Sequence, residues 1–418
     1  MPVENTEIVI VGGGVIGLAT AVGLVAAGRE VVLIDRNQPG SGASFGNAGI
    51  IAEYASVPLG TPAVLRSLPK LIFCSDSPLA LRKAEILGLA PWLIRFLFQS
   101  LPAAARANGT ALWKLVGDAV PAWRTLAAEV EAGDLLRDTG SLHLYRDRAD
   151  FNEAAWGREL RNRLGSRQQL LSASEVQALE PQLNFDSGTG LFFPDTMSVS
   201  DPGRLMCRLL DAALARGVVV KRADVTRIQT DQCAPRVSGP GIEIAARSVV
   251  IATGAYSRGL AAQAGDRIPL DTERGYHLEF PVATPLLSRP VCPVDLGFYM
   301  APMEGRLRVA GTVELGGLTA PPNPRRFAPL DRGVRRYFPS LGESVSQWMG
   351  NRPSLPDSRP VIGRARSSPD VIYAFGHGHI GVTLAAITAR LVTGAIVNGD
   401  ELPVEFGPAR FRGSARAG

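Results

Sequence analysis

The chain has 418 residues, of which 46% are hydrophobic and 20% are charged. This length and composition are typical of a globular protein of two or three domains, and they exclude an intrinsically disordered chain. The formal net charge of +5 is a mild excess that fits an anionic substrate or an anionic membrane surface, and we expect no nucleic-acid partner.

The first predicted element is an apolar strand that ends in a glycine-rich turn. Gly12, Gly14 and Gly17 lead from this strand into a predicted helix over residues 15–27. Free amides and the positive end of a helix attract anions, so the turn predicts a backbone cradle for the pyrophosphate of a dinucleotide. The next strand ends at Asp35, at the distance where a carboxylate accepts hydrogen bonds from ribose hydroxyls.

A second glycine-rich loop follows at residues 40–49. A nicotinamide-binding domain needs only the first glycine cluster, whereas a flavin needs both, because its flat ring must lie against backbone with no side chain in the way. Gly46, Asn47, Ala48 and Gly49 supply small residues and exposed amides. The two loops together therefore predict an FAD site.

Helical patterns then occupy residues 61–99 and 112–132. Within the first of them, residues 87–101 are too short and too interrupted to span a bilayer. Their Trp and Phe side chains, with Arg82 and Arg95 nearby, leave two interpretations open. The segment is either a helix at a membrane interface or a helix packed on the protein's own core, and we favour the second.

The middle of the chain is predicted to build a separate unit and then to return to the nucleotide-binding domain. An amphipathic helix followed by short apolar strands marks that return. The expected elements are strands at 140–145 and 190–193, a helix at 204–216, and strands at 217–221, 242–244 and 248–252.

An antiparallel sheet with one exposed face is predicted at residues 274–280, 298–302 and 306–311, because apolar and polar residues alternate there. A substrate wall could be built on this sheet. Residues 371–397 then repeat the pattern of strand, glycine turn and helix, so the nucleotide domain is predicted to consist of three separated segments. The tail after Pro408 is expected to be frayed.

The four cysteines show no paired spacing, and we expect reduced thiols with no disulfide, zinc or iron–sulfur site. Glu4 and Glu7 stand where a secretory signal would need basic residues. The expected location is therefore the cytoplasm, or a peripheral position on the inner face of the cell membrane.

These motifs resemble the FAD-dependent amino acid oxidoreductases of the D-amino acid oxidase family, most of all the bacterial D-amino acid dehydrogenase branch. The resemblance implies an α/β fold, α+β overall, in which a Rossmann-like domain binds FAD without a covalent link and a second domain binds substrate on a largely antiparallel sheet. It covers nearly the whole chain and is carried by the motifs at 12–17, 44–49, 252–254, 274–276, 299–302, 350–353, 360–363 and 376–379. We expect the FAD-binding domain at 1–56, 166–264 and 350–418, and the substrate-binding domain at 57–165 and 265–349.

The resemblance also implies site residues. Arg352 and Tyr299 match the arginine and tyrosine that bind the substrate carboxylate in related proteins, and a guanidinium suits this task because it donates two parallel hydrogen bonds. Tyr276 and His379 complete the candidate catalytic set, although His377 and His379 are each either a donor to the flavin or a loop histidine with a local partner. The candidate FAD-binding residues are Gly12, Gly14, Val15, Ile16, Gly17, Asp35, Arg36, Ser44, Asn47, Ala48, Gly49, Val225, Ala252, Gly254, Gly378, His379, Gly381, Val382 and Thr383.

The activity that the resemblance implies is oxidative deamination of D-amino acids. A hydride passes from Cα to flavin N5, water hydrolyses the imino acid, and the electrons go to a quinone or another acceptor. Neutral substrates are suggested, with D-proline or hydroxy-D-proline among them. The alternatives are an oxygen-using oxidase of the glycine or sarcosine type, a flavin subunit of a hetero-oligomeric dehydrogenase, and a nicotinamide-dependent reductase.

Overall fold

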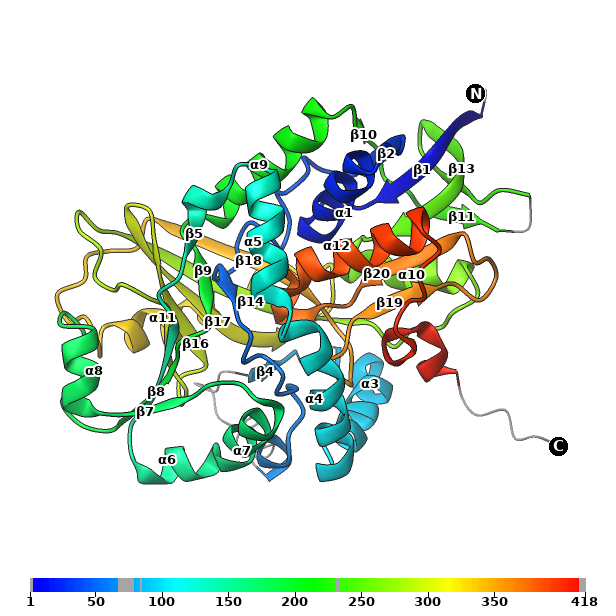
Figure 1. Cartoon of the computed structure of the whole chain (residues 1–418). Helices are drawn as coiled ribbons and strands as arrows, with labels where there is room; N and C mark the ends of the chain where they lie inside the picture. The colour runs from blue at the N-terminus through cyan, green and yellow to red at the C-terminus, as the bar shows by residue number, and fades with distance from the viewer. Residues whose placement is uncertain (1–2, 67–78, 83–84, 231–232, 413–418) are drawn as a thin grey trace.

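A computed structural model describes residues 3–66, 79–82, 85–230 and 233–412. Figure 1 shows two bodies of secondary structure side by side, one with α1 and α12 on the right and one with α8 and α11 on the left. The predicted α/β class, α+β overall, is confirmed. A small three-stranded sheet lies between the two bodies and consists of β3 (Ile50–Ile51), β9 (Met197–Val199) and β5 (Leu136–Arg137).

The first large sheet is mainly parallel and draws its strands from three separated segments, as predicted. Its strands run in the order β10-β2-β1-β13-β12-β11, with β20 paired to β13 and β19 paired to β20. In β1, Ile8 and Ile10 face one core cluster while Val9 and Val11 face another, which explains the continuous apolar run. The strands are β1 (Glu4–Val11), β2 (Val31–Asp35), β10 (Val219–Arg222), β11 (Arg227–Gln229), β12 (Arg236–Gly239), β13 (Ile242–Ile251), β19 (Val361–Arg364) and β20 (Val371–Phe375).

Helices cover both faces of this sheet. One stretch, residues 378–397, is long and apolar enough to cross a membrane by length and composition, but 61% of its apolar window is buried inside the protein. It contains α12, which packs on α1 and α5, so it is the central core helix of this body. The covering helices are α1 (Val15–Ala26), α5 (Ala119–Glu129), α9 (Pro202–Ala215), α10 (Ser257–Gln263) and α12 (Gly381–Val397).

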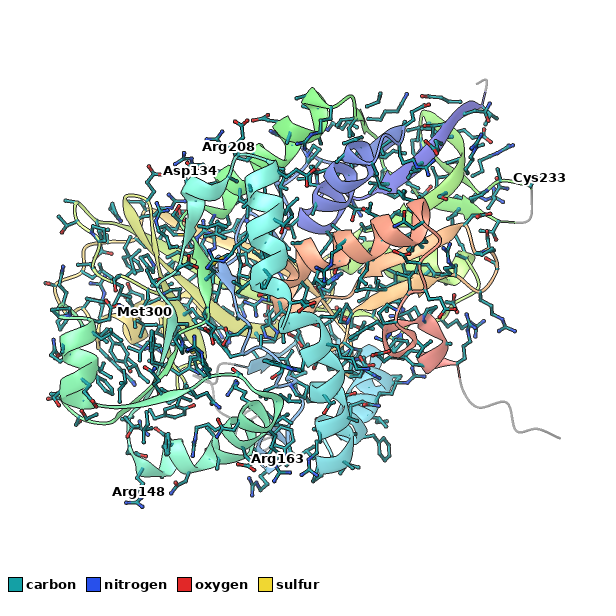
Figure 2. All side chains as sticks on the ribbon, in the orientation of Figure 1. Asp134, Arg148, Arg163, Arg208, Cys233 and Met300 are labelled. Carbon is teal, nitrogen blue, oxygen red and sulfur yellow. The ribbon has the colours of Figure 1, made fainter. Side chains whose placement is uncertain are left out.

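The second large sheet has nine strands in the order β18-β14-β17-β16-β15-β6-β8-β7, with β4 paired to β17. One face packs on α8 (Ala173–Leu179) and α11 (Phe327–Val334), where Met300 lies fully buried on the left of Figure 2. The strands are β4 (Leu79–Leu81), β6 (Ser141–Tyr145), β7 (Gln169–Ser172), β8 (Thr189–Phe193), β14 (Asp271–Pro281), β15 (Val291–Pro293), β16 (Phe298–Met303), β17 (Arg306–Leu315) and β18 (Ser346–Ser354).

The structure corrects three local predictions. The two strands predicted at 242–244 and 248–252 are the single strand β13, because Ala245 and Ala246 between them stay paired with β1. Strand β4 lies within the predicted helical region 61–99, of which residues 67–78 and 83–84 fall outside the described part of the chain. The predicted exposed face of the antiparallel sheet is wrong: β14 is buried at every position from Thr272 to Leu278, because both faces of the sheet are covered.

Sheet membership also differs from the predicted division into domains. Residues 166–199 were assigned to the FAD-binding domain, but β7 and β8 pair with β6 in the second sheet. Strand β18 likewise pairs with β14. The division itself stays a prediction, with these three strands moved to the substrate side. The remaining helices on that side and between the bodies are α3 (Ile86–Gln99), α4 (Pro102–Val116), α6 (Arg148–Glu153) and α7 (Ala155–Leu164).

The end of the described chain is ordered rather than frayed as far as Arg412. Arg410 donates to the buried carboxylate of Asp357 at 2.8 Å, and Arg412 donates to Asp266 at 2.9 Å. These ion pairs tie the segment to the first body. Among the described residues, Cys207, Cys233 and Cys292 form no disulfide with one another.

Candidate active site

A cavity of about 610 Å³ runs from the glycine loops of the first sheet to one face of the second sheet, a size typical of a pocket for a small molecule or cofactor. All predicted site residues border it except Gly17 and Gly49. Gly49 instead lies directly before β3, has a φ of +69°, and packs on Val199 of β9. The structure therefore brings together residues that are up to about 370 positions apart in the chain.

The three glycines of the first turn have three different physical roles. Gly12 has a φ of +109°, and a Cβ there would lie 2.6 Å from the carbonyl carbon of Ala252. A Cβ on Gly17 would collide with the carbonyl oxygen of Gly12, so this glycine lets α1 pack on the strand. A Cβ on Gly14 would meet only Ser44 Oγ, at 3.6 Å. The space beside Gly14 is open toward the cavity, as a phosphate cradle requires.

Asp35 is held at the end of this cavity beside the first glycine turn by backbone amides. Its Oδ2 accepts from Gly13 N at 2.6 Å and its Oδ1 from Asn37 N at 2.8 Å. Each carboxylate oxygen keeps a lone pair for a ribose hydroxyl. Next to it, the Arg36 guanidinium lies 3.8 Å from the centre of the Tyr256 ring, so it closes this end of the cavity.

The two histidines of the C-terminal glycine loop have different surroundings. His377 is buried, and its Nε2 is 3.0 Å from Thr388 Oγ1, so it is a loop histidine with a local partner. His379 borders the cavity, and its side chain is exposed to the cavity while protein surrounds it on the other sides. Burial, and next the charge of Arg352, lower the pKa of His379 to about 4, so its imidazole is neutral at pH 7.

Thr383, in the first turn of α12, connects this helix to residues 50–52, which follow the second glycine-rich loop. Its hydroxyl donates to Ile50 O at 3.0 Å and accepts from Ala52 N at 3.2 Å. Trp123 of α5 donates to Val382 O at 2.7 Å. The N-terminus of α12 is thereby fixed facing the cavity, where its positive end favours negative charge.

The opposite end of the cavity is formed by one face of the second sheet, and Arg352 projects from β18 on this face. The guanidinium is half-buried and lies against Gly275 of β14, where a Cβ would be 2.5 Å from Cζ and 2.6 Å from Nε. Its Nη1 donates to Thr312 O at 3.4 Å. The absence of a side chain at Gly275 is therefore what allows Arg352 to occupy this position.

Thr312 occupies a strained backbone conformation beside Arg352. Its φ of +53° is unusual for a β-branched residue. The residue lies at an irregularity where the β14–β17 register shifts between Arg274 and Tyr276. The bulge directs the Thr312 carbonyl toward the guanidinium, so that it helps to fix Arg352.

Tyr299 belongs to a buried hydrogen-bonded group in the same wall. Its hydroxyl lies 2.9 Å from Tyr54 Oη and 3.0 Å from His143 Nε2. Burial, and next the charge of Arg161, lower the pKa of His143 to about 3, so the ring is neutral. Tyr299 is free to donate to a ligand only when His143 and Tyr54 both donate to it, since a hydroxyl has one proton.

The prediction of a catalytic Tyr276 differs from the geometry. Alternation along β14 places Gly275 and His277 on the face that carries Arg352 and Trp348, and the Tyr276 ring in the core cluster, edge-on to Phe327. Its hydroxyl donates to Glu314 at 2.5 Å. Tyr276 borders the cavity, but its polar group is engaged away from it.

Sequence reasoning did not predict how side chains hold the second glycine-rich loop, residues 40–49, against the second sheet. Trp348 stacks on His277 with ring centroids 5.1 Å apart, and it fills the space beside Gly46, where a Cβ would clash with it. His277 Nδ1 lies 3.0 Å from Gly46 O, and the buried Arg308 donates to Asn47 O at 2.6 Å. The alternation of apolar and polar residues in β14 and β17 could have indicated that these side chains share one face of the sheet. No nearby sequence pattern indicated that they contact the loop.

A parallel sheet with a pyrophosphate cradle, joined to an antiparallel wall that presents a guanidinium, defines a flavin-dependent oxidoreductase. The family described as DAO, FAD dependent oxidoreductase, matches residues 7–395. The chain belongs to this family, which confirms both the predicted family and its cofactor, FAD.

The chain is similar to several named proteins over nearly its full length. It is 35% identical to a D-amino-acid oxidase of Bradyrhizobium diazoefficiens, over 98% of this chain and 99% of that protein. It is 31% identical to a D-amino acid dehydrogenase of Paramagnetospirillum magneticum, over 92% and 94%. Among solved structures, glycine oxidase from Geobacillus kaustophilus superposes with a TM-score of 0.78 at 23% identity, covering 97% of this chain and 99% of that one. This last likeness shows the fold.

Proposed function

We propose that the protein oxidises D-amino acids with FAD as its cofactor, in the manner of a D-amino acid dehydrogenase. The relatives named for this reaction support the proposal, and the single observation that carries it is Arg352. Its guanidinium lies in the cavity wall, and its hydrogen bond goes to a backbone carbonyl, whereas the carboxyl group of its cross-strand neighbour Glu273 acts on it through charge without a hydrogen bond. A substrate carboxylate is the partner that such a group binds best.

We infer that the predicted cofactor residues around Gly14, Asp35, Asn47 and the start of α12 bind FAD, which when bound accepts the two electrons removed from the amino acid. The chain itself supplies binding and orientation: Arg352 and Tyr299 hold the carboxylate of the substrate and so fix the direction of its Cα–H bond.

The cavity also acts on the charge of the substrate amine. The carboxylates that border it among the described residues, Asp35 and Asp224, lie at the nucleotide end, whereas Arg352 and Arg161 border the other end. A positive field disfavours an ammonium group. The amine is therefore bound more readily in its neutral form, which is the form that can expel a hydride from Cα.

The first experiment is anaerobic mixing of the purified holoenzyme with D- and L-amino acids, glycine and N-methyl amino acids, with the flavin absorbance as readout. We expect bleaching by D-amino acids. Arg352→Met should raise KM about 100-fold or more while FAD remains bound, because a charge-assisted double hydrogen bond is lost. Bleaching by L-amino acids or glycine alone, or an unchanged KM in this variant, would contradict the proposal.

For the electron acceptor we propose a membrane quinone, reached through helix α3. This helix buries Leu89 and Trp92 on one side. The other side exposes an apolar stripe of Ile94, Leu97 and Phe98 at the i, i+3, i+4 spacing of one helical face, and these side chains are 54%, 41% and 65% exposed; Leu101, 47% exposed, follows just after the end of the helix. Such a stripe near cationic side chains is typical of a helix that lies in a membrane interface.

This second proposal is tested with liposomes that contain anionic lipid. We expect the holoenzyme to co-sediment with them, and the double variant Ile94→Ser and Phe98→Ser to stay in the supernatant. Leu170→Ser is the matched control, because Leu170 is 60% exposed on β7, the strand at the end of the second sheet's order. Rapid peroxide release with no reduction of a quinone analogue would instead favour an oxygen-using oxidase.

A further inference from the structure

A second guanidinium borders the substrate end of the cavity. Arg161 lies on α7, which belongs to the substrate side, and its Nε donates to the carbonyl oxygen of Tyr54 at 3.0 Å. Its Cζ is 5.4 Å from the centre of the Phe193 ring and 5.7 Å from that of Tyr54. The side chain is thus held in one place by a backbone hydrogen bond and two aromatic rings.

Arg161 has no carboxylate partner among the described residues. Its neighbours on the helix do have partners: Arg163 pairs with Glu159 at 2.7 Å, and Arg158 donates to Phe151 O. A guanidinium carries five N–H donors, and the hydrogen bond to Tyr54 uses one of them. The Nη groups of Arg161 therefore remain available to a ligand in the cavity.

The charge of Arg161 acts on the same wall that is proposed to bind the substrate. It is among the causes of the lowered pKa of His143, whose Nε2 contacts Tyr299. Arg352 approaches the cavity from β18 of the sheet, and Arg161 from α7. One carboxylate of a small amino acid satisfies one of these two cations. A ligand with two carboxylates satisfies both.

We propose that Arg161 binds a side-chain carboxylate of the substrate, and that the enzyme acts preferentially on dicarboxylic D-amino acids. This inference rests on the proposed function, which it refines by naming the substrate class. It differs from the neutral substrates, such as D-proline, that the sequence resemblance suggested.

The test compares isosteric pairs on the holoenzyme: D-glutamate with D-glutamine, and D-aspartate with D-asparagine. Because a hydrogen bond between charged groups is strong, we expect at least one acid to exceed its amide by about 10- to 100-fold in kcat/KM, mainly through KM. In Arg161→Met this ratio should fall to near one, and Arg161→Lys should restore part of it. Arg163→Met is the matched control, since Arg163 lies on the outer side of the same helix (Figure 2) and is 60% exposed.

Equal kcat/KM for acid and amide in the unmodified enzyme, or an unchanged ratio in Arg161→Met, would overturn the inference. A second measurement does not depend on the variants: titration of the holoenzyme with succinate and with propionate, followed by the visible spectrum of the flavin. Succinate should bind at least tenfold more tightly, and equal affinities would count against a second anion site. If no D-amino acid bleaches the flavin, the proposed function fails, and the succinate titration still tests the role of Arg161.

Discussion

Replacing Gly275 with Ala should displace Arg352 without touching either the substrate or the cofactor. The added Cβ would lie 2.5 Å from Cζ and 2.6 Å from Nε of Arg352, whereas ordinary contacts begin near 3.4 Å. The guanidinium must therefore retreat by about 1 Å, and a misplacement of that size in a binding group costs on the order of 100-fold in rate. The backbone itself should accept Ala, because Gly275 lies in β14 and is not among the glycines of positive φ.

The assay is steady-state oxidation of the best D-amino acid with an artificial acceptor dye, together with FAD content and Tm. We expect kcat/KM to fall about 10- to 100-fold, with FAD bound and Tm little changed. Gly259→Ala is the control, because a Cβ at that position on α10 meets nothing within 4 Å. Normal kinetics in Gly275→Ala would refute the reasoning, since either Arg352 does not bind the substrate or its position does not depend on this glycine.

Two other predictions concern the cofactor and pH. Gly14→Ala should fold normally and bind FAD at least about tenfold more weakly, because its Cβ projects into the cavity. Gly17→Ala should fail to fold, because its Cβ meets the backbone of Gly12. Equal FAD titrations for Gly14→Ala and the unmodified protein would contradict the prediction of weaker FAD binding. Burial lowers the pKa of His143 and His377 to about 3 and that of His277 to about 4. The unfolded chain takes up these protons near pH 6.5 and the folded chain does not, so stability is lost as the pH falls from 6.5 toward 4, by about 1.4 kcal/mol per pH unit for each histidine. A Tm that is constant between pH 7.5 and 5 would argue against this.

The nucleotide-binding half could be predicted from the sequence because its signals are local. A buried parallel strand is a continuous apolar run, and Gly12, Gly14 and Gly17 stand at fixed offsets from it. Strand β20 and helix α12 repeat the same local order. Each segment can therefore be assigned to the nucleotide-binding half from its own sequence pattern, even though the segments are far apart in the chain.

The substrate end depends on contacts between distant residues, and much of it could not be predicted. Arg161 lies on a polar helix whose pattern matches that of any exposed helix, and its place in the cavity is set by Tyr54 and Phe193. The bulge at Thr312 has no sequence signal, because a β-branched residue is disfavoured in its conformation. His377 and His379 are two positions apart and were not distinguished, since their directions follow from the turn that begins α12.

The order of the segments in the first sheet has a consequence for synthesis. Strand β13 is flanked by β1 from the start of the chain and by β20 near its end, and α12 covers α1. During translation, the N-terminal strand and its glycine turn leave the ribosome long before β20 and α12 exist. A nascent polypeptide thus has no complete pyrophosphate and flavin site, and loading of the coenzyme must wait until β20 and α12 have been synthesised.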